Sequence, residues 1–588
     1  MGTITRPILG RSTDTKLPIM GHRPMYLMHK FFARKQANVI REYIKSHSSK
    51  QDVVLDPFCG SGVMIGESLR LKRHAIGIDI NPVSIFISKN TLTFVSPDLI
   101  LDEFNRIKHD VAKEIDSLYR STCRICGLPI NAICMTWNHS ELVDIRYDCP
   151  KDGKRIDPVN KFDLELINSI INGEDLRFFN EKGHSKFWFP KLPLMYPNGV
   201  PFLKKEHYNH IPDLFTPRNL IALAKLLSSI QKISKAQLKQ AFLFAFSSII
   251  HLASKMVPVR PSRPFSSAWV QQSYWSAPNF MESNVWSLFD RAITGKQGLL
   301  SAKRDLKQSI DDIQYKCNIN EIFQKRDSEI LRFTLINSSL ENLEIIPDDS
   351  IDYVITDPPY GHSIQYGELL YLWGAWLNLV DEYNTTLSQE LIENSHQNKT
   401  ITDYENHLFI IFKEIFRVLK PKKWLTVTFH NPQLKYRAIL YRCAILSGFS
   451  LEEIHYQPPA RPSAKSLLQP FGSLSGDYFF RFKKPYTPIN KDFQLISEDQ
   501  FEKIVVKMVY EIIKEYEIPI PYTLIQNSLD PKLYKKLYEH DMLLTFHPKK
   551  IENILSKHLG ELFVLSDIKW KITGNKEISM KGWFIIEN

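Results

Sequence analysis

The pattern of hydrophobic and polar positions predicts alternating strands and helices near the start of the chain. A short apolar run at 52–56 predicts a buried strand, and the apolar spacing at 63–71 predicts a helix. A second run at 75–79 predicts another strand, before Asn81-Pro82 restarts a helix. Because strands joined through a helix run parallel, this order predicts a parallel sheet with a ligand at its carboxyl edge.

The same alternation resumes in the second half of the chain. The two stretches together predict one α/β domain with a Rossmann-like sheet, split by a long, mostly helical insertion that costs little loop entropy. The predicted boundaries are 1–95 for the first half of the sheet domain, 96–330 for the insertion, 331–490 for the second half and 491–588 for a C-terminal α/β appendage. The later strand-like runs are 333–337, 351–357, 424–429, 450–457 and 477–482, with helices expected at 404–419 and 434–447.

The appendage at 491–588 has a pattern of its own. Six apolar residues share one helical face, and the stretch from Trp570 to Ile586 alternates like a hairpin around Gly574-Asn575. This pattern fits a winged-helix module or a domain that only packs against the rest, and the sequence leaves both interpretations open. The six residues are Phe501, Ile504, Val505, Met508, Ile512 and Tyr516.

Composition and charge narrow the class of protein. The 588 residues carry a net charge of +11 at pH 7 with a pI near 9.0, which favours a polyanionic partner without requiring one. No apolar run reaches the ~18 to 20 residues that cross a bilayer, and the first residues lack the apolar core of a signal peptide. Seven cysteines, four of them clustered, favour reduced thiols over a disulfide framework. We expect a cytoplasmic protein with no membrane partner.

The first motif with chemical meaning follows the strand at 52–56 and runs from Asp56 to Gly62. Gly60 and Gly62 permit a sharp turn beneath an adenosyl cofactor, and Asp56 at the strand end can accept from an amino group. Phe58 can pack on the adenosine, and Asp79 at the end of the next strand can accept from ribose hydroxyls. A nucleotide-binding oxidoreductase is the rival interpretation, but the G-x-G-x-x-G spacing of that class is absent.

The second motif, Asp357-Pro358-Pro359-Tyr360, ends another predicted strand. The Asp357 carboxylate and the Pro358 carbonyl can accept protons from an exocyclic amine and so expose the nitrogen lone pair for methyl transfer. Pro359 stiffens the backbone, and Tyr360 can stack on a flipped base. Methylation of cytosine carbon 5 would need a cysteine nucleophile after a proline, and protein-glutamine methylases read Asn-Pro-Pro-Tyr, so both are disfavoured.

A third cluster predicts a metal site inside the insertion, at about 115–160. Two glycine-flanked cysteine turns have the spacing of zinc knuckles, although aspartate replaces the fourth cysteine. Cys134 or His139 could complete the set instead, so whether structural zinc is bound stays open. The candidate ligands are Cys123, Cys126, Cys149 and Asp152.

Two loops mix basic, amide and aromatic residues with proline and serine, a composition suited to phosphate and base contacts. Arg260, Arg263 and Gln271 lie in the insertion, whereas Arg461 and Lys465 follow a strand near the expected catalytic edge. We expect these five residues to contact DNA, with a purely structural loop as the alternative in each case.

Taken together, the motifs resemble those of the adenine-specific DNA methylases that carry a zinc ribbon. The matching stretches cover about 25–480: His29 to Lys35, Asp56 to Gly62, Cys123 to Gly153, Asp213 to Leu220 and Asp357 to Tyr360. The resemblance implies the sheet of S-adenosylmethionine-dependent methyltransferases. It also implies that Phe32, within the first stretch, covers the methionine end of that cofactor.

The resemblance further implies DNA as substrate and adenine as the favoured base, with the cytosine amino group as an alternative. A tRNA guanine methyltransferase can share the second motif, but such enzymes usually carry an RNA-binding domain for which the ~50 residues before Asp56 leave no room. A catalytically silent DNA-binding subunit is the alternative outside enzymes. DNA is the expected partner, and the protein could act alone or beside a cognate restriction endonuclease or other defence-system subunits. No nuclease carboxylate-lysine cluster is evident, so we expect no cutting activity.

Overall fold

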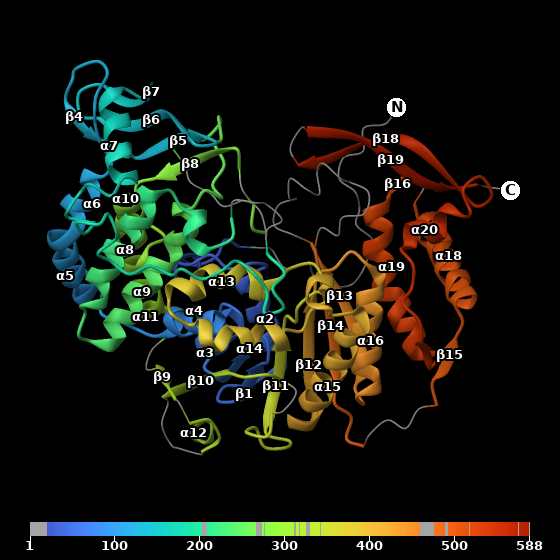
Figure 1. The fold of residues 1–588 in the computed structure, drawn as a ribbon. Helices are drawn as coiled ribbons and strands as arrows, with labels where there is room; N and C mark the ends of the chain where they lie inside the picture. The colour runs from blue at the N-terminus through green and yellow to red at the C-terminus, as the bar shows by residue number, and fades with distance from the viewer. Residues whose placement is uncertain are drawn as a thin grey trace.

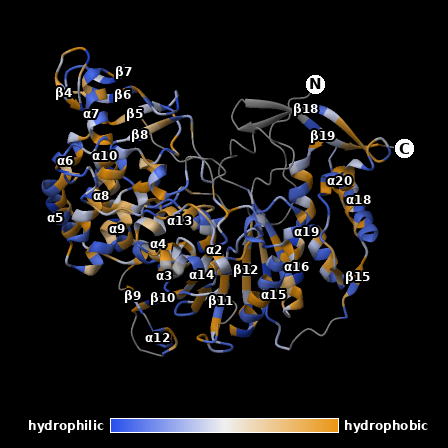
Figure 2. Ribbon diagram, viewed as in Figure 1, coloured by the Kyte–Doolittle hydropathy of each residue, from blue (hydrophilic) through white to orange (hydrophobic). Residues whose placement is uncertain are grey.

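The structure, a computed structural model, describes residues 20–202, 208–265, 273–275, 277–310, 313–316, 318–324, 330–340, 343–458, 476–487, 492–516, 518–573 and 576–586. Figure 1 shows a central sheet with the helical insertion on one side and the C-terminal segment on the other. Hydrophobic residues follow the strands around β12 (Leu419–Phe429) (Figure 2). No helix in the described part of the chain is long and apolar enough to cross a membrane.

The central sheet has eight strands in the order β13-β14-β12-β11-β1-β2-β10-β9. All neighbours pair in parallel except β14, which runs antiparallel to both β12 and β13. The predicted α/β sheet, split by an insertion, is therefore confirmed. Its edge strand β9 comes from residues that the sequence analysis assigned to the insertion, before residue 331. The strands not yet delimited are β1 (Val53–Asp56), β2 (His74–Asp79), β9 (Ile313–Tyr315), β10 (Leu331–Asn337), β11 (Ile351–Thr356), β13 (Ser450–Gln457) and β14 (Asp477–Lys483).

The order of the strands reverses at β1. From β1 the chain passes to β2 on one side, and it returns through the insertion to β11 on the other side, where Leu55 pairs with Val354. The carboxyl ends of β1 and β11 therefore lie side by side at a topological switch point, where open α/β sheets bind ligands. Both strands are buried along their whole length because helices cover both faces of the sheet.

Helices next to the switch point link the sheet to the insertion. α9 (Ala236–Ile250), from the insertion, packs against α4 (Pro82–Leu92) and α13 (Tyr366–Trp376) of the sheet domain. The His29 ring nitrogen Nε2 lies 3.0 Å from the Ser247 hydroxyl in the same contact region. The other helices that flank the sheet are α2 (Ala37–His47), α3 (Val63–Arg70), α15 (Ile401–Val418) and α16 (Leu434–Leu446).

The insertion combines helices with a small β structure. Its four-stranded antiparallel sheet has the order β7-β6-β5-β8, and a short ladder of β3 with β4 lies before it in the chain. These strands are β3 (Arg120–Thr122), β4 (Pro129–Asn131), β5 (Cys134–Asn138), β6 (Glu141–Cys149), β7 (Gly153–Pro158) and β8 (Asn279–Ser283). The larger helices are α5 (Pro97–Ile107), α7 (Lys161–Ile171), α8 (Pro217–Gln231), α10 (Val285–Thr294) and α11 (Leu299–Ser309).

The C-terminal segment packs on the sheet domain through buried polar groups. Arg437 of α16 and Asp530 form an ion pair with Nε and Oδ2 2.8 Å apart, and both side chains are fully buried. Gln526 adds a hydrogen bond from its side-chain amide to the Pro432 carbonyl at 3.0 Å. The segment contains a three-stranded sheet in the order β16-β19-β18. Its elements are α18 (Glu498–Lys514), β16 (Ile520–Pro521), α19 (Tyr522–Glu539), α20 (Ile551–Ser556), β18 (Phe563–Thr573) and β19 (Lys576–Ile585).

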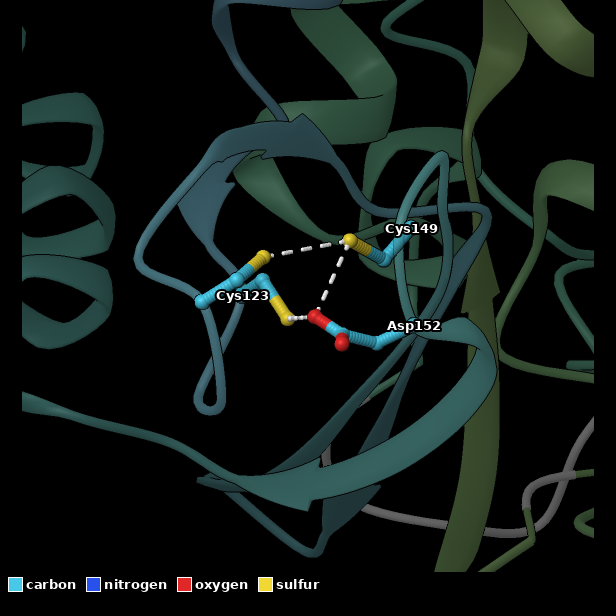
Figure 3. A group of neighbouring side chains, drawn as sticks. Cys123, Cys149 and Asp152 are labelled. Atoms are coloured by element: carbon cyan, nitrogen blue, oxygen red, sulfur yellow. Dashed lines mark hydrogen bonds between the residues drawn. The ribbon is translucent and has the colours of Figure 1, made fainter.

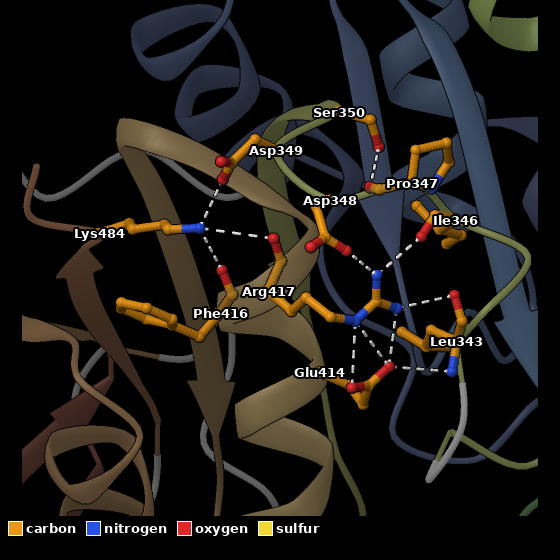
Figure 4. Close-up of polar contacts among 10 residues, drawn as sticks. All are labelled: Leu343, Ile346, Pro347, Asp348, Asp349, Ser350, Glu414, Phe416, Arg417 and Lys484. Carbon is orange, nitrogen blue, oxygen red and sulfur yellow. Dashed lines mark hydrogen bonds and ion pairs between the residues drawn. The ribbon is translucent and has the colours of Figure 1, made fainter. Parts of the chain in front are cut away.

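A polar clamp fixes the end of β11 away from the switch point (Figure 4). Arg417 near the end of α15 donates to the carbonyls of Leu343 and Ile346 at 2.9 and 3.0 Å. Lys484, directly after β14, donates to the Asp349 carboxylate at 2.6 Å and to the Phe416 carbonyl at 2.7 Å. The clamp thus joins the segment that leads into β11 to a helix and to the last strand of the sheet.

Candidate functional site

A pocket lies at the switch point, at the carboxyl ends of β1, β2 and β11. Residues of the predicted cofactor turn and of the predicted catalytic motif line the same pocket, together with the segment around Phe32. The space between them amounts to about 1010 Å³, which includes its open mouth and is at the upper end of the usual range of roughly 300–1,000 Å³ for ligand sites. The sheet therefore brings both motifs, 300 residues apart along the chain, to one cavity.

The glycine turn after β1 has the geometry that only glycine adopts without strain. Gly60 and Gly62 have φ of +48° and +78°. A β-carbon at Gly60 would lie 2.9 Å from the Phe31 ring, and one at Gly62 would lie 3.0 Å from the Ser88 hydroxyl. The Ser88 hydroxyl also donates to the Gly60 carbonyl at 2.7 Å, which fixes the turn. The backbone can thus approach a ligand closely at this point.

Asp56 and Asp79 face the pocket with different bonding. Asp56 Oδ1 accepts from the Thr356 hydroxyl at 2.8 Å and from the Phe58 amide at 3.2 Å, and burial raises the pKa of Asp56 to about 8. Asp79 accepts from the amides of Gly60 and Asn81 at 2.9 and 2.8 Å, and burial raises the pKa of Asp79 to about 6. Buried carboxylates of this kind favour a cationic or hydroxyl-rich ligand over a phosphate.

Aromatic side chains form the side of the pocket nearest the segment at 29–35. Phe58 is half-buried and lines the cavity, and Phe32 is buried with its ring centroid 6.2 Å from that of Trp373. Arg34 donates to the Ser61 hydroxyl at 3.2 Å and thereby ties this segment to the glycine turn. The predicted positions of Phe32 and Phe58 beside the turn agree with this geometry.

The Asp357 side chain is held by donors from three parts of the chain. Oδ1 accepts from the Thr428 hydroxyl at 2.5 Å and lies 3.3 Å from the Lys35 ammonium. The Tyr360 hydroxyl lies 2.6 Å from Oδ1 and 2.7 Å from Oδ2. Burial raises the pKa of Asp357, while the Lys35 charge and the hydroxyl donors oppose that rise. Two residues further along the chain, the Pro359 carbonyl accepts a hydrogen bond from the Tyr404 hydroxyl at 2.7 Å.

The Tyr360 ring, predicted to stack on a base, is almost completely buried, with 2% of its surface exposed. It meets the Phe429 ring edge to face, with centroids 5.3 Å apart. The Asn431 side-chain amide donates to the Tyr360 carbonyl at 2.8 Å and fixes the backbone. In this arrangement Tyr360 acts on Asp357 through its hydroxyl, and a stacking role would require its ring to turn toward the pocket.

Lys35, Thr428 and Asp477 belong to the site although the sequence analysis did not assign them. The Lys35 ammonium donates to Asp477 Oδ1 at 2.7 Å, in addition to its ion pair with Asp357. Lys35 lies within the segment from His29 to Lys35 that was noted for its resemblance, and this was the available signal. Asp477 begins β14 and Thr428 lies near the end of β12. Only the order of the strands in the folded sheet brings these two residues to the site, so no local sequence pattern indicates them.

The predicted metal ligands come together at one end of the insertion (Figure 3). The ligand atoms of Cys123, Cys126, Cys149 and Asp152 all lie within 4.8 Å of one another, and the sulfurs of Cys126 and Cys149 are 3.5 Å apart. Tetrahedral zinc with Zn–S bonds of about 2.3 Å spaces its sulfurs by roughly 3.7 Å, so the donor set fits zinc. Cys134 is elsewhere, with its sulfur 3.9 Å from the Pro264 carbonyl.

Of the five predicted DNA contacts, two fall within the described residues. Arg263 is exposed and Arg260 is half-buried. The loop that carries them packs on the small sheet, where the Lys154 ammonium lies 5.7 Å from the centre of the Phe265 ring. Neither arginine forms an ion pair within the part of the chain that the structure describes. Gln271, Arg461 and Lys465 lie outside the described residues.

Comparison with known proteins finds a family that resembles the first part of the chain. The family model described as DNA methylase, which covers N6- and N4-methylases, matches residues 11–90. This stretch contains the segment around Phe32, the glycine turn and Asp79. Residues 11–90 are therefore similar to the N6/N4 DNA methylases.

Two curated relatives agree with this family. The chain is 24% identical over 379 residues to the type II methyltransferase M.BsoBI of Geobacillus stearothermophilus, a match that covers 63% of this chain and 56% of that protein. It is 25% identical over 103 residues to the type II methyltransferase M.MjaII of Methanocaldococcus jannaschii, covering 16% of this chain and 19% of that protein. The matches thus span little more than half the length of the first relative and about a fifth of the second.

Solved structures of S-adenosylmethionine-dependent methyltransferases also resemble parts of the chain. One from Methanosarcina mazei has 11% sequence identity and a TM-score of 0.16, and covers 30% of this chain and 82% of that chain. One from Mesorhizobium loti has 10% sequence identity and a TM-score of 0.16, and the match covers 31% of this chain and 84% of that chain. TM-scores this low say nothing about the whole chain, whose fold class follows from its own strand order.

Proposed function

We propose that the protein transfers a methyl group from S-adenosylmethionine to an exocyclic amino group of DNA, with adenine as the favoured base. The observation that supports this most directly is that the glycine turn and the Asp357 motif line one pocket. The family match and the type II relatives support DNA as the substrate. Cytosine remains the alternative base, because the same geometry serves its amino group.

The pocket suits a cationic cofactor. Asp56, Asp79 and Asp357 contribute three carboxylates to its lining, and the Lys35 ammonium is shared between Asp357 and Asp477. S-adenosylmethionine, when bound, supplies an electrophilic methyl group on a positively charged sulfonium. Asp56 Oδ2, which receives no hydrogen bond from the described residues, would accept from the ammonium group of the methionine. Asp79 would accept from the ribose hydroxyls.

The catalytic part of the proposal concerns the amine. Its nitrogen is a weak nucleophile because its lone pair is delocalised into the ring. Hydrogen bonds from its protons to Asp357 Oδ2 and to the Pro358 carbonyl would pyramidalise the nitrogen and direct the lone pair into the pocket. Since Asp357 lines the pocket with only 14% of its side chain exposed, the base would have to leave the duplex to reach it. No covalent enzyme intermediate is required.

We also propose that the cysteine cluster holds one structural zinc ion. Three thiolates and the Asp152 carboxylate are a set of donors that zinc accepts, and the ligand atoms already lie within 4.8 Å of one another. Elemental analysis of the purified protein should give one zinc per chain, and a Cys126→Ser, Cys149→Ser double variant should give none. A wild-type protein without zinc, prepared without chelators, would contradict this part of the proposal.

The first experiment uses cofactor with a labelled methyl group and two substrates in parallel, unmethylated genomic DNA and total tRNA. Mass analysis of the digested nucleosides should find N6-methyladenosine from DNA alone. Amino-methylated cytosine would correct the base and keep the rest. Label in guanosine from tRNA would instead support an RNA methyltransferase, and cofactor binding without transfer would overturn the proposal for this chain acting alone.

A further inference from the structure

Lys35 occupies a position between two carboxylates that come from distant parts of the chain. Its ammonium lies 2.7 Å from Asp477 Oδ1 and 3.3 Å from Asp357 Oδ1, and 5.1 Å from the centre of the Tyr360 ring. Only 7% of the Lys35 side chain is exposed. A buried ammonium loses its hydration, and these two carboxylates offset that loss by pairing with its charge.

The two oxygens of Asp357 are used unequally. Oδ1 receives the Thr428 hydroxyl at 2.5 Å and the Lys35 ammonium at 3.3 Å, whereas among the described residues Oδ2 has only the Tyr360 hydroxyl, at 2.7 Å. That hydroxyl also lies 2.6 Å from Oδ1 and has a single proton to donate. When Tyr360 donates to Oδ1, Oδ2 is left as a free acceptor.

We propose that Lys35 is a positioning residue for catalysis: its ammonium keeps Asp357 ionised and holds Oδ1, so that Oδ2 alone accepts the proton of the target amine. The inference rests on the proposed amino-methyl transfer and deepens it. Asp477 holds Lys35 in place, and the His430 ring nitrogen Nδ1, 3.4 Å from Asp477 Oδ1, in turn supports Asp477. Neither Lys35 nor Asp477 needs to contact the substrate.

The charge of Lys35 matters because the other surroundings of Asp357 disfavour its ionised form. Burial is the largest influence on the Asp357 pKa and raises it, and the charge of Asp477 raises it further. Within the described residues, Asp56, Tyr360 and Tyr366 are further ionisable groups that interact with Asp357, and none of these three is a cation. A protonated Asp357 would present a hydroxyl to the amine and could no longer accept with both oxygens.

The kinetic test compares Lys35→Met with Lys35→Arg and Asp477→Asn under single-turnover conditions with saturating cofactor. Lys35→Met should lower the rate of transfer by about 100-fold near neutral pH while cofactor affinity changes by less than about threefold. The loss should shrink as pH rises, because Asp357 then ionises without its counter-ion. Lys35→Arg should restore most of the rate, and Asp477→Asn should keep it within about tenfold, because it leaves Lys35 to Asp357 alone.

A second measurement does not depend on activity. Infrared spectra of the wild type and the variants at about pH 6 should share a protonated-carboxyl band from Asp56, whose pKa is raised to about 8. Lys35→Met should show an additional protonated-carboxyl band that is absent from the wild type and from Lys35→Met/Asp357→Asn. If Lys35→Met fails to fold because it leaves the buried carboxylates of Asp357 and Asp477 unpaired, the Lys35→Met/Asp477→Asn variant replaces it in this measurement. No such additional band, together with an unchanged rate profile, would overturn the inference. An additional band without transfer to any nucleic acid by the wild type would keep the role of Lys35 and reject the proposed function instead.

Discussion

The two ends of β11 carry clusters of cations and carboxylates that look alike in composition and differ in exposure. At the carboxyl end, Lys35 and Asp357 have 7% and 14% of their side chains exposed. At the amino end, Arg417 and Lys484 bind Asp348 and Asp349, whose side chains are 73% and 53% exposed. Water screens the charges of the second cluster, so this cluster costs little free energy. The charges of the first cluster are removed from water, and that desolvation has a free-energy cost.

The hydrogen bonds differ as well. In the clamp at the amino end, the cations donate to backbone carbonyls as well as to carboxylates (Figure 4). At the carboxyl edge, Asp56 and Asp357 each keep one oxygen with spare acceptor capacity facing a cavity. Groups that are buried, charged and not fully bonded are costly for stability, so their presence points to a ligand. The saturated cluster needs only a structural explanation.

The largest effect should come from Asp357→Ala. This change removes the acceptor for the target amine, so transfer should fall by at least about 1,000-fold, since several transition-state interactions are lost together. Cofactor affinity, measured by calorimetry, should stay within about threefold, because Asp56 and Asp79 are unchanged. Single-turnover transfer of labelled methyl groups to DNA measures the first effect.

The matched control for this variant is Asp349→Ala, at the other end of the same strand. It removes a carboxylate that is paired with Lys484 but faces solvent, so transfer should remain at the wild-type rate. If Asp357→Ala were fully active, or if both variants lost activity equally, the assignment of function to the carboxyl end would be wrong.

Both carboxylates at the centre of the site could be predicted from the sequence because each directly follows a buried run. Asp56 and Asp357 end strands that are apolar throughout, and parallel strands present their carboxyl ends at one edge. The cysteine cluster was also predictable, since its paired turns are local. These features depend on spacing over a few residues, which a sequence displays directly.

The support of Asp357 could not be predicted in this way. Lys35 and Asp477 are separated by 442 positions, and no local pattern relates them. Their contact exists because β14 inserts antiparallel between β12 and β13, which returns Asp477 to the carboxyl edge. Similarly, Tyr360 beside two prolines indicates a loop with an aromatic ring, whereas only packing against Phe429 determines that its hydroxyl faces Asp357.

The next effect in size concerns the cofactor end of the same edge. Asp79→Ala should weaken binding of S-adenosylmethionine by about 10- to 100-fold, the usual consequence of losing hydrogen bonds to a charged group. Asp79→Asn should lose less, because one oxygen still accepts from the Gly60 or Asn81 amide. Calorimetry on both variants measures this difference, and unchanged affinity in Asp79→Ala would move the ribose contact elsewhere.

Asp56 offers a smaller effect with a distinct pH dependence. Burial raises its pKa to about 8, so at neutral pH the empty pocket holds mostly the protonated form. A cationic ammonium requires the carboxylate, and binding must therefore release a proton. The affinity for S-adenosylmethionine should rise with pH by at most about tenfold per pH unit below about pH 8. Above that pH it should level off.

Calorimetry in buffers of different ionisation enthalpy measures the released proton directly. Asp56→Asn should remove that release and flatten the pH profile, while the titration of Asp79, with its pKa near 6, should persist in both proteins. Proton release that survives in Asp56→Asn would show that another group on this edge receives the ammonium.

The smallest effect on transfer should come from breaking the clamp at the amino end. Arg417→Met removes the donors to the carbonyls of Leu343 and Ile346, so the thermal midpoint should fall by about 2–4 °C. The rate of transfer per folded molecule should not change, because the clamp lies at the far end of β11 from Asp357. Asp348→Ala, which removes only an exposed partner, should leave even the midpoint within about 1 °C. A lower rate in Arg417→Met well below its midpoint would show that β11 transmits strain between its ends, and the two clusters would then have to be treated as one.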